Sequence, residues 1–274
     1  QQAMALGYQG KKQEKADLLK KMREAYPGST YLANGQYQEA RTLHELKDYD
    51  RALNAYNEVY MATPNGPFAV SCLTNMGSIY RMKNDPDNAL VMFKKAVDLL
   101  KGKGTLEFQN LMKEIKDMYL VKNQLDQWEA YAASVGFSES TAVADSTSYA
   151  LAAKFYNEGN CAGSLIQANK YIQKYPSGLY ITEIHYMRAE CSFKANDYNT
   201  ALGSYNAILD KGQTKYTEMA LKRAGFIYYT QKDWNNSIRV YKRLETEAKN
   251  VSDQNDAKVN LMRCYVFVNN KDSA

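Results

Sequence analysis

Apolar and small residues recur along the chain with the spacing of amphipathic α-helices, and these helices come in pairs. In residues 186–209 the first helical pattern carries Ala189, a polar turn follows at 196–197, and the second pattern carries Ala201 and Tyr205. Apolar positions at helical spacing that are interrupted by a short polar turn indicate two consecutive helices. We therefore expect this segment to form an antiparallel helix pair.

The same pattern returns about every 37 residues along the whole chain. Two helices approach closely only where side chains are small, and large rings one turn away fill the remaining space. One pair cannot bury its own apolar surface, so neighbouring pairs must stack into a solenoid. The turn positions that mark the repeat are Lys12, Tyr49, Pro86, Leu125, Cys161, Tyr198, Trp234 and Ser273. The sequence thus predicts an all-α solenoid with about six full repeats and a partial one at each end.

These features resemble the tetratricopeptide repeat (TPR). The first helix of a pair carries a small residue and an aromatic one three positions later, as at Tyr80 and Tyr228, and a proline such as Pro176 closes the second helix. The resemblance covers essentially the whole chain and implies a right-handed α-solenoid whose first helices line a concave groove. It is poor around the fourth pair, where Lys116 and Trp128 occupy the two small-residue positions, so we expect local irregularity there.

A finer resemblance concerns the segment between repeats. Residues 171–193 read YIQKYPSGLYITEIHYMRAECSF and echo residues 21–43. This style is similar to TPR proteins of the Gram-negative cell envelope, namely the lipoprotein of the outer-membrane β-barrel assembly machinery and the periplasmic TPR partner of the Tol–Pal system. The resemblance implies a location on the periplasmic side of a bacterial cell envelope, with the cytoplasm as the alternative.

We expect two sub-arrays, residues 1–137 and 138–274, or else one continuous solenoid. Residues 134–150 form the most Ser/Thr-rich stretch, which predicts either a flexible joint or a long loop whose Asp145 or Ser146 caps the next helix. The glycine-containing residues 101–105 are expected to form a solvated loop. Both chain ends fall inside repeats, so the sequence is expected to be a fragment, and the remainder of its own longer chain is one expected partner.

Charge and composition exclude several classes of function. The net charge is +5, and 35 basic residues are scattered among 30 acidic ones, so no basic stripe suited to nucleic acid is present. No run of 18 apolar residues suggests a membrane span. The cysteines at positions 72, 161, 191 and 264 have neither zinc nor disulfide-framework spacing. They are expected to be small core residues, with a Cys161–Cys191 bridge as the alternative.

Catalytic motifs are absent from the sequence. The two histidines, His44 and His185, stand far apart, and no nucleophile elbow, phosphate-binding loop or metal-ligand spacing accompanies them. Each histidine is expected to be a surface or groove residue of a first helix. We therefore predict that the chain is not an enzyme and binds no cofactor or metal.

The TPR resemblance also indicates which first-helix residues face the groove. In the third pair these are Ser71, Thr74, Ser78 and Arg81. In the C-terminal half the predicted partner-binding residues are Tyr149, Tyr156, Tyr186, Glu190, Phe193, Lys222, Phe226, Tyr229 and Tyr265. Rigid aromatic rings offer large contact area at low entropic cost, although the same rings could instead pack between repeats.

The predicted function is therefore a non-catalytic scaffold that binds a peptide or protein partner in its groove. The repeated Lys, Asn and Arg positions that grip a C-terminal carboxylate in some TPR proteins are not reproduced, Arg41 and Arg81 being the nearest approach. Two alternatives remain open. One is a carbohydrate-binding outer-membrane protein of the TPR type, and the other is a regulatory or scaffold segment of an enzyme whose catalytic domain lies outside this chain.

Overall fold

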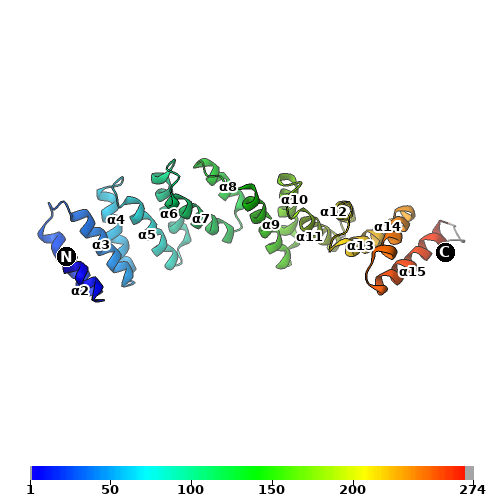
Figure 1. Ribbon diagram of the computed structural model, residues 1–274, viewed down its shortest axis with the longest axis horizontal. Coiled ribbons are helices and arrows are strands. Elements are labelled where there is room, and N and C mark those ends of the chain that lie inside the picture. Colours follow the sequence, from blue (N-terminus) through cyan, green and yellow to red (C-terminus); the bar gives the residue numbers. More distant parts are fainter. Residues whose placement is uncertain (1, 269–274) are drawn as a thin grey trace. The chain divides into compact units, whose positions relative to one another are not determined.

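A computed structural model describes residues 2–268, and these residues form α-helices joined by short connections, with no strand among them (Figure 1). The helices are α1 (Gln2–Tyr8), α2 (Lys12–Ala25), α3 (Leu32–Glu45), α4 (Tyr49–Ala62), α5 (Ala69–Met82), α6 (Pro86–Leu100), α7 (Leu106–Val121), α8 (Leu125–Ser134), α9 (Thr141–Asn157), α10 (Cys161–Lys174), α11 (Ile181–Lys194), α12 (Tyr198–Leu209), α13 (Thr217–Thr230), α14 (Trp234–Glu247) and α15 (Val251–Phe267).

The predicted repeat of helix pairs is confirmed. Each turn position from Lys12 to Trp234 is the first residue of an even-numbered helix, which we call helix B, and the odd-numbered helix before it is helix A. Within the described residues, α3 to α14 make six complete pairs, with α1–α2 and α15 on either side. The predicted all-α solenoid architecture is thus present. Ser273 lies outside the described residues.

Every turn from helix A to helix B contains a residue with the same backbone conformation. The residue two positions before each helix B has a left-handed conformation, with φ between 56° and 75°. Glycine and asparagine adopt this conformation most readily, and they occupy five of the seven positions. The seven residues are Gly10, Lys47, Asn84, Asn123, Gly159, Asn196 and Lys232.

The next residue usually caps helix B. In five pairs an Asp or Asn side chain accepts a hydrogen bond from the backbone N–H three residues later, which satisfies one of the free donors of the first turn. The capping residues are Asp48, Asp85, Asn160, Asp197 and Asp233. The short polar turns of the sequence therefore encode both the reversal of the chain and the start of helix B.

The core of each pair lies where its two helices cross. In the third and seventh pairs a ring of helix B packs there against a small residue of helix A. A Cβ atom added to Gly77 would lie 2.5 Å from the Phe93 ring, and one added to Gly225 would lie 2.7 Å from the Tyr241 ring. Ala89, on the second helix at the same crossing as Phe93, is fully buried. The alternation of small residue and ring is therefore a packing requirement.

The fourth pair departs from this pattern, as its sequence predicts. Lys116 and Trp128 take the two small-residue positions and are both buried. The Trp128 ring packs edge-on against Phe137, with 5.8 Å between ring centroids. The second helix of this pair, α8, has 10 residues and is the shortest helix B. A bulky crossing residue thus coincides with a truncated helix.

The prediction of a long loop in residues 134–150 is wrong. Helix α9 begins at Thr141, and its cap is the side chain of Ser140, which accepts from the N–H of Val143, not Asp145 or Ser146. Asp145 lies inside the helix, is buried, and accepts hydrogen bonds from the Tyr171 hydroxyl and from the N–H of Leu179. Its carboxylate is therefore used to join α9 to the α10–α11 connection. The predicted solvated loop at 101–105 is confirmed.

The chain divides into two compact units, residues 1–138 and residues 139–274, which we call the N-terminal and C-terminal units and describe separately. Whether they are separate sub-arrays or parts of one continuous solenoid stays a prediction.

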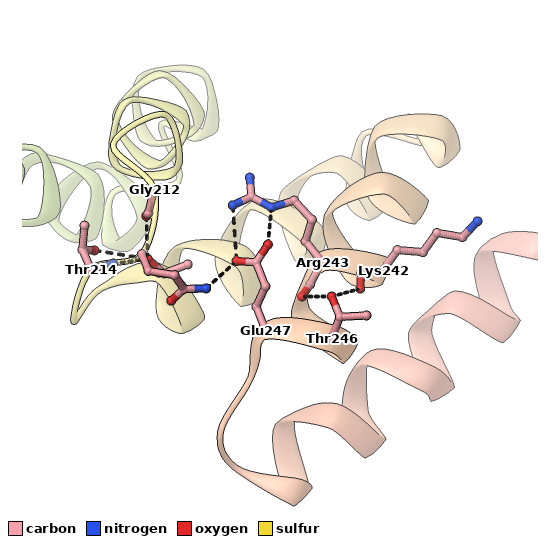
Figure 2. A network of polar contacts seen from close by, with 8 residues as sticks. Gly212, Thr214, Lys242, Arg243, Thr246 and Glu247 are labelled. Atoms are coloured by element: carbon pink, nitrogen blue, oxygen red, sulfur yellow. Dashed lines mark hydrogen bonds and ion pairs between the residues drawn. The ribbon is translucent and has the colours of Figure 1, made fainter.

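Polar contacts tie one repeat to the next within each unit. In the N-terminal unit, Lys122 Nζ lies 2.6 Å from the carboxylate of Asp87 one repeat earlier, and Lys83 contacts Asp50 in the same way. In the C-terminal unit, the Glu247 carboxylate of α14 accepts a 2.8 Å hydrogen bond from Gln213 in the α12–α13 connection. Glu247 also accepts from Arg243, as Figure 2 shows. The contacts of Lys122, Lys83 and Gln213 therefore each link two neighbouring repeats.

The cysteines split between the two expected roles. Cys72 and Cys264 are free and buried, and burial raises the pKa of the Cys72 thiol to about 12. Cys161 and Cys191 form a disulfide with 5.2 Å between their Cα atoms. This bond links the start of α10 to the interior of α11, so these two cysteines covalently join the fifth and sixth repeats.

Candidate functional site on the helix-A face

Side-chain contacts bridge consecutive helices A within each unit, and we call the surface that these helices form the helix-A face. It is made of α3, α5 and α7 in the N-terminal unit, and of α9, α11, α13 and α15 in the C-terminal unit. Pairs of residues 30 or 31 positions apart bridge these neighbouring helices. Three of the pairs are stacked rings, Tyr37–Phe68, Tyr149–Tyr180 and Tyr186–Tyr216, with centroid separations of 4.7, 4.2 and 4.2 Å.

The second ring of each stack is the residue immediately before a helix A. Phe68, Tyr180 and Tyr216 are the N-cap residues of α5, α11 and α13. Aromatic pairs of this kind contribute stability beyond the apolar area that they bury. Each stack therefore fills the space between one helix A and the start of the next.

Between α13 and α15 an ion pair takes the place of the rings. Lys222 Nζ lies 2.6 Å from the Asp253 carboxylate, and these residues are 31 positions apart. The position that holds a tyrosine in other repeats thus holds Lys222 here, and its partner is the acid Asp253 in place of a second ring.

Neither a ring stack nor an ion pair joins the equivalent positions of α5 and α7. The first position of the pair is Thr74, and residues 104–107, around the second position, are Gly-Thr-Leu-Glu and carry no ring. The hydroxyl of Thr74 is buried without a hydrogen-bond partner. A groove of about 540 Å³ opens at this place, lined by Thr74, Ser78, Arg81, Phe93, Leu106, Glu107, Asn110, Leu111 and Glu114.

This groove has an apolar floor and a polar rim. Phe93 and Leu111 are buried, whereas Leu106, Glu107 and Asn110 are exposed on α7. Arg81 and Glu114 form an ion pair across it. Exposed pairs of this kind contribute about 0–1 kcal/mol, so a ligand that competes for either side chain faces a small cost. Thr74, Ser78 and Arg81 are residues that the sequence indicates as facing the groove.

The predicted partner-binding rings of α9 and α11 contact one another. Tyr149, Tyr156 and Tyr186 are each half-buried. Tyr156 meets Tyr186 edge-on at 6.2 Å, and Tyr186 stacks in turn on Tyr216. The alternative of packing between repeats is therefore realised for these rings, while part of each ring stays accessible.

A second ring cluster joins α11 to α13. The half-buried ring of Phe193 lies 5.8 Å from that of Phe226, and the Arg223 guanidinium lies 4.3 Å from the Phe193 centroid. Phe226 is 44% exposed, and Met219 on the same helix is 39% exposed. Large apolar side chains are thus available to a partner at this point.

The two remaining predicted rings lie towards α15. Tyr229 packs edge-on against Trp234 at 5.2 Å and against Phe267 at 6.1 Å. Tyr265 is half-buried, and the ammonium of Lys242 lies 5.7 Å from its ring. Tyr229 and Tyr265 both pack against the same buried core of the C-terminal unit.

The two charged residues of the predicted set have internal partners. Glu190 is 7% exposed, accepts a 2.6 Å hydrogen bond from the Tyr205 hydroxyl and lies 3.7 Å from Arg223. Lys222 is held by Asp253. The expectation that Glu190 lines an open groove is corrected, because helix B of its own pair covers it.

The histidines lie in different units, on α3 and α11. His44 packs edge-on against Tyr49 and Tyr56, and burial lowers its pKa. Burial, followed by the charges of Arg188 and Lys211, lowers the pKa of His185. Both imidazoles are therefore held towards the neutral form by their packing. The sequence describes His44 as a groove or surface residue, and the structure places it half-buried.

The described residues can be compared with the geometry of metal-ligand groups and of membrane-spanning helices. Between residues 2 and 268 no three His, Cys, Asp or Glu side chains come together as metal ligands. No helix over the same residues combines the length and apolar character that crossing a bilayer requires.

Sequence reasoning missed the residue before each helix A. Tyr180 and Tyr216 were not singled out in the sequence, yet they complete the stacks. The signal that could have revealed them is the 30-to-31-residue spacing between aromatic positions. The same spacing, applied to Thr74, would have pointed to the gap between α5 and α7.

Comparison with known proteins gives a family match for part of the chain. Residues 28–102 match the family model described as tetratricopeptide repeat, a span that covers less than half of the 274 residues and contains α3 to α6. No curated protein sequence matches the chain.

Solved structures show similarity at low identity. A TPR protein from Parabacteroides merdae is 15% identical, with 96% of each chain covered and a TM-score of 0.42. The TPR2AB domain of yeast Sti1, solved as a complex with pHSP90, is 12% identical over 96% of this chain and 95% of that one, with a TM-score of 0.44. A chain of the Naa15/Naa10 complex with HypK is 11% identical over 97% of this chain and 38% of its own length, with a TM-score of 0.49.

Proposed function

We propose that this protein is a non-catalytic scaffold that holds a peptide or protein partner on its helix-A face. The observation that carries the proposal is the groove between α5 and α7, a concave site of about 540 Å³ that combines apolar walls with several polar side chains. Binding sites are typically concave, largely apolar and equipped with a few orienting polar groups. The TPR match in residues 28–102 includes α5, one wall of this groove.

The exposed rings of the C-terminal unit support the same proposal. Phe226 keeps 44% of its surface exposed although it contacts Phe193. A ring that is fixed by its neighbour and still accessible gives a partner large contact area with little loss of side-chain entropy. We infer that Tyr156, Tyr186, Phe193, Phe226 and Tyr229 contribute to partner contact through their accessible edges.

A carbohydrate ligand is less well supported. Sugar rings are usually recognised by open aromatic platforms, and both tryptophans are engaged in packing. Trp128 is 2% exposed, and Trp234 stacks on Phe267 at 4.6 Å.

The proposal predicts that Phe226→Ala weakens partner binding about tenfold, which corresponds to ~1.4 kcal/mol. The partner would be recovered from native cells by crosslinking, purified and titrated against each variant. Ile166→Ala is the matched control, because Ile166 is a 56% exposed apolar residue on the helix-B side. Equal affinities for wild type and Phe226→Ala, with a loss for Ile166→Ala, would contradict the proposal.

We further propose that the protein works in an oxidising compartment, and the periplasmic side of a bacterial cell envelope is the one that the sequence resemblance suggests. The support is the Cys161–Cys191 disulfide, because disulfides persist in such compartments and are rare in the cytosol. Alkylating free thiols before cell lysis tests the proposal. Cys161 and Cys191 should escape labelling, and their labelling in intact cells would argue for the cytoplasm.

A further inference from the structure

The spaces between neighbouring helices A in each unit can be compared position by position. Stacked rings bridge α3 to α5, α9 to α11, and α11 to α13, and an ion pair bridges α13 to α15. In each case the bridge joins residues 30 or 31 positions apart. The space between α5 and α7 is the exception within these two sets, and it contains the groove.

The exception is local to one site. The rest of the third pair keeps the repeat, since Gly77 meets Phe93 at the helix crossing and Asp85 caps α6. At the two bridging positions the chain has Thr74 and the non-aromatic residues 104–107. The groove therefore has the position of a ring stack from which both rings are missing.

We propose that the groove between α5 and α7 binds an aromatic side chain, tyrosine in particular, that projects from the partner segment. This inference rests on the proposed function, because it names the part of the partner that the helix-A face recognises. The partner's ring would occupy the space that the chain's own stacked rings fill in other repeats. It would lie on the apolar floor made by Phe93 and Leu111.

The size of the groove agrees with this occupant. A cavity of about 150 Å³ with apolar walls is enough to bind benzene, so about 540 Å³ accommodates a phenol ring together with the backbone that carries it. A purely aliphatic side chain would leave part of this space empty. It would also lose the flat contact that rings make with an edge or face of Phe93.

The polar atoms of the groove favour a ring with a hydroxyl. The Thr74 hydroxyl is buried and unpartnered, and a buried polar group without a hydrogen bond is costly. A phenol can both donate to and accept from a hydroxyl, so a bound tyrosine that displaces the side chains covering Thr74 would supply the missing partner. Asn110 and Ser78 at the same groove provide further groups for the backbone of the bound segment.

An ionic occupant, by analogy with Lys222 and Asp253, fits less well. The charged side chains of the groove are Arg81, Glu107 and Glu114, and Arg81 and Glu114 already neutralise each other. They lie at the rim, above the Phe93 and Leu111 floor. A charged group pushed to that floor would lose its hydration without gaining a partner.

The test uses 4-methylphenol, the tyrosine side chain, titrated into the full chain and followed by amide NMR shifts. We expect saturable binding with a dissociation constant on the order of millimolar, and shifts centred on Thr74, Ser78, Asn110 and Leu111. Thr74→Phe should weaken binding at least tenfold, because the new ring fills the groove. Gln109→Phe adds the same ring to an exposed position of α7 outside the groove lining and should leave binding unchanged.

A further variant keeps the test valid if Thr74→Phe does not fold. Leu106→Tyr places a ring at the groove from a 71% exposed position, so it should fold normally and also weaken binding of 4-methylphenol. Cyclohexanol, of similar size but without a π-system, should bind several-fold more weakly than 4-methylphenol. Absence of saturable shifts at the groove, or binding that survives both Thr74→Phe and Leu106→Tyr, would overturn the inference.

The result of the 4-methylphenol experiment can be distinguished from the result of the partner-binding experiment that tests the proposed function. If 4-methylphenol does not bind while Phe226→Ala still weakens partner binding, the scaffold proposal stands and the aromatic site falls. If 4-methylphenol binds at the groove but no partner is held on the helix-A face, the site exists without the proposed function.

Discussion

Replacing Tyr205 by alanine is expected to lower the free energy of unfolding of the C-terminal unit by about 4 kcal/mol, the usual cost of deleting a buried ring. Tyr205 is fully buried and packs at the crossing of α11 and α12. Its hydroxyl also donates to the Glu190 carboxylate, which is 7% exposed. The substitution therefore opens a cavity and removes a hydrogen bond from a buried acid.

Urea denaturation followed by circular dichroism measures the effect, with Tyr205→Phe as the control. The phenylalanine variant keeps the ring and loses only the hydrogen bond, so we expect it to cost about 1–3 kcal/mol. A loss below about 1 kcal/mol for Tyr205→Ala would mean that the ring does not fill the crossing. The described packing of repeat six would then be wrong.

Removing the disulfide by the double change Cys161→Ala and Cys191→Ala is expected to destabilise the C-terminal unit by about 3 kcal/mol. The bond closes a segment with a sequence separation of 30, and cross-links of this loop length typically contribute about 2–4 kcal/mol by restricting the unfolded chain. Cys191 is also buried, so its loss should be felt in the packing of α11.

Reduction provides the matched measurement. A reductant should lower the melting temperature of the wild-type chain towards that of the double variant and should leave the double variant unchanged. The free cysteines Cys72 and Cys264 are present in both proteins and cannot account for a difference. Equal melting temperatures for oxidised wild type and double variant would contradict a stabilising bond.

The fold could be predicted from the sequence because its determinants are local and repeated. A turn residue able to adopt positive φ, such as Asn196, is followed by a capping Asp197 and then by a small residue and a ring. Each of these features has a fixed spacing, so seven turn positions coincide with the first residues of seven helices. Because these local sequence preferences agree with the overall fold, the repeats can be predicted from the sequence.

The prediction was wrong where a polar residue can either cap a helix or contact a distant segment of the chain. The Ser/Thr-rich stretch before Tyr149 suggested a loop, because these residues often cap helices and compete with helix formation. The structure extends α9 through it, with the Ser140 side chain as the cap and Asp145 directed to Tyr171 and Leu179. The partner of Asp145 is a later segment of the chain, which no local pattern reveals.

The candidate site could be predicted only in part. Thr74, Ser78 and Arg81 were identified by their positions on helix A, and they line the groove. The groove itself depends on the missing ring across the gap, and this absence becomes visible only when the stacks of other repeats are known. Glu190 was misjudged for a related reason, because its covering residue, Tyr205, belongs to the next helix.

A photo-crosslinking scan of the protein in its native cells tests the central claim, that partners bind the helix-A face, most directly. A photoreactive phenylalanine would replace Asn110 or Phe226 on that face, and Val91 or Ile166 on exposed helix-B surfaces of the same two units. The account predicts that a common partner is trapped from Asn110 and Phe226 and not from the helix-B positions. A partner trapped from Val91 and Ile166 alone would contradict it.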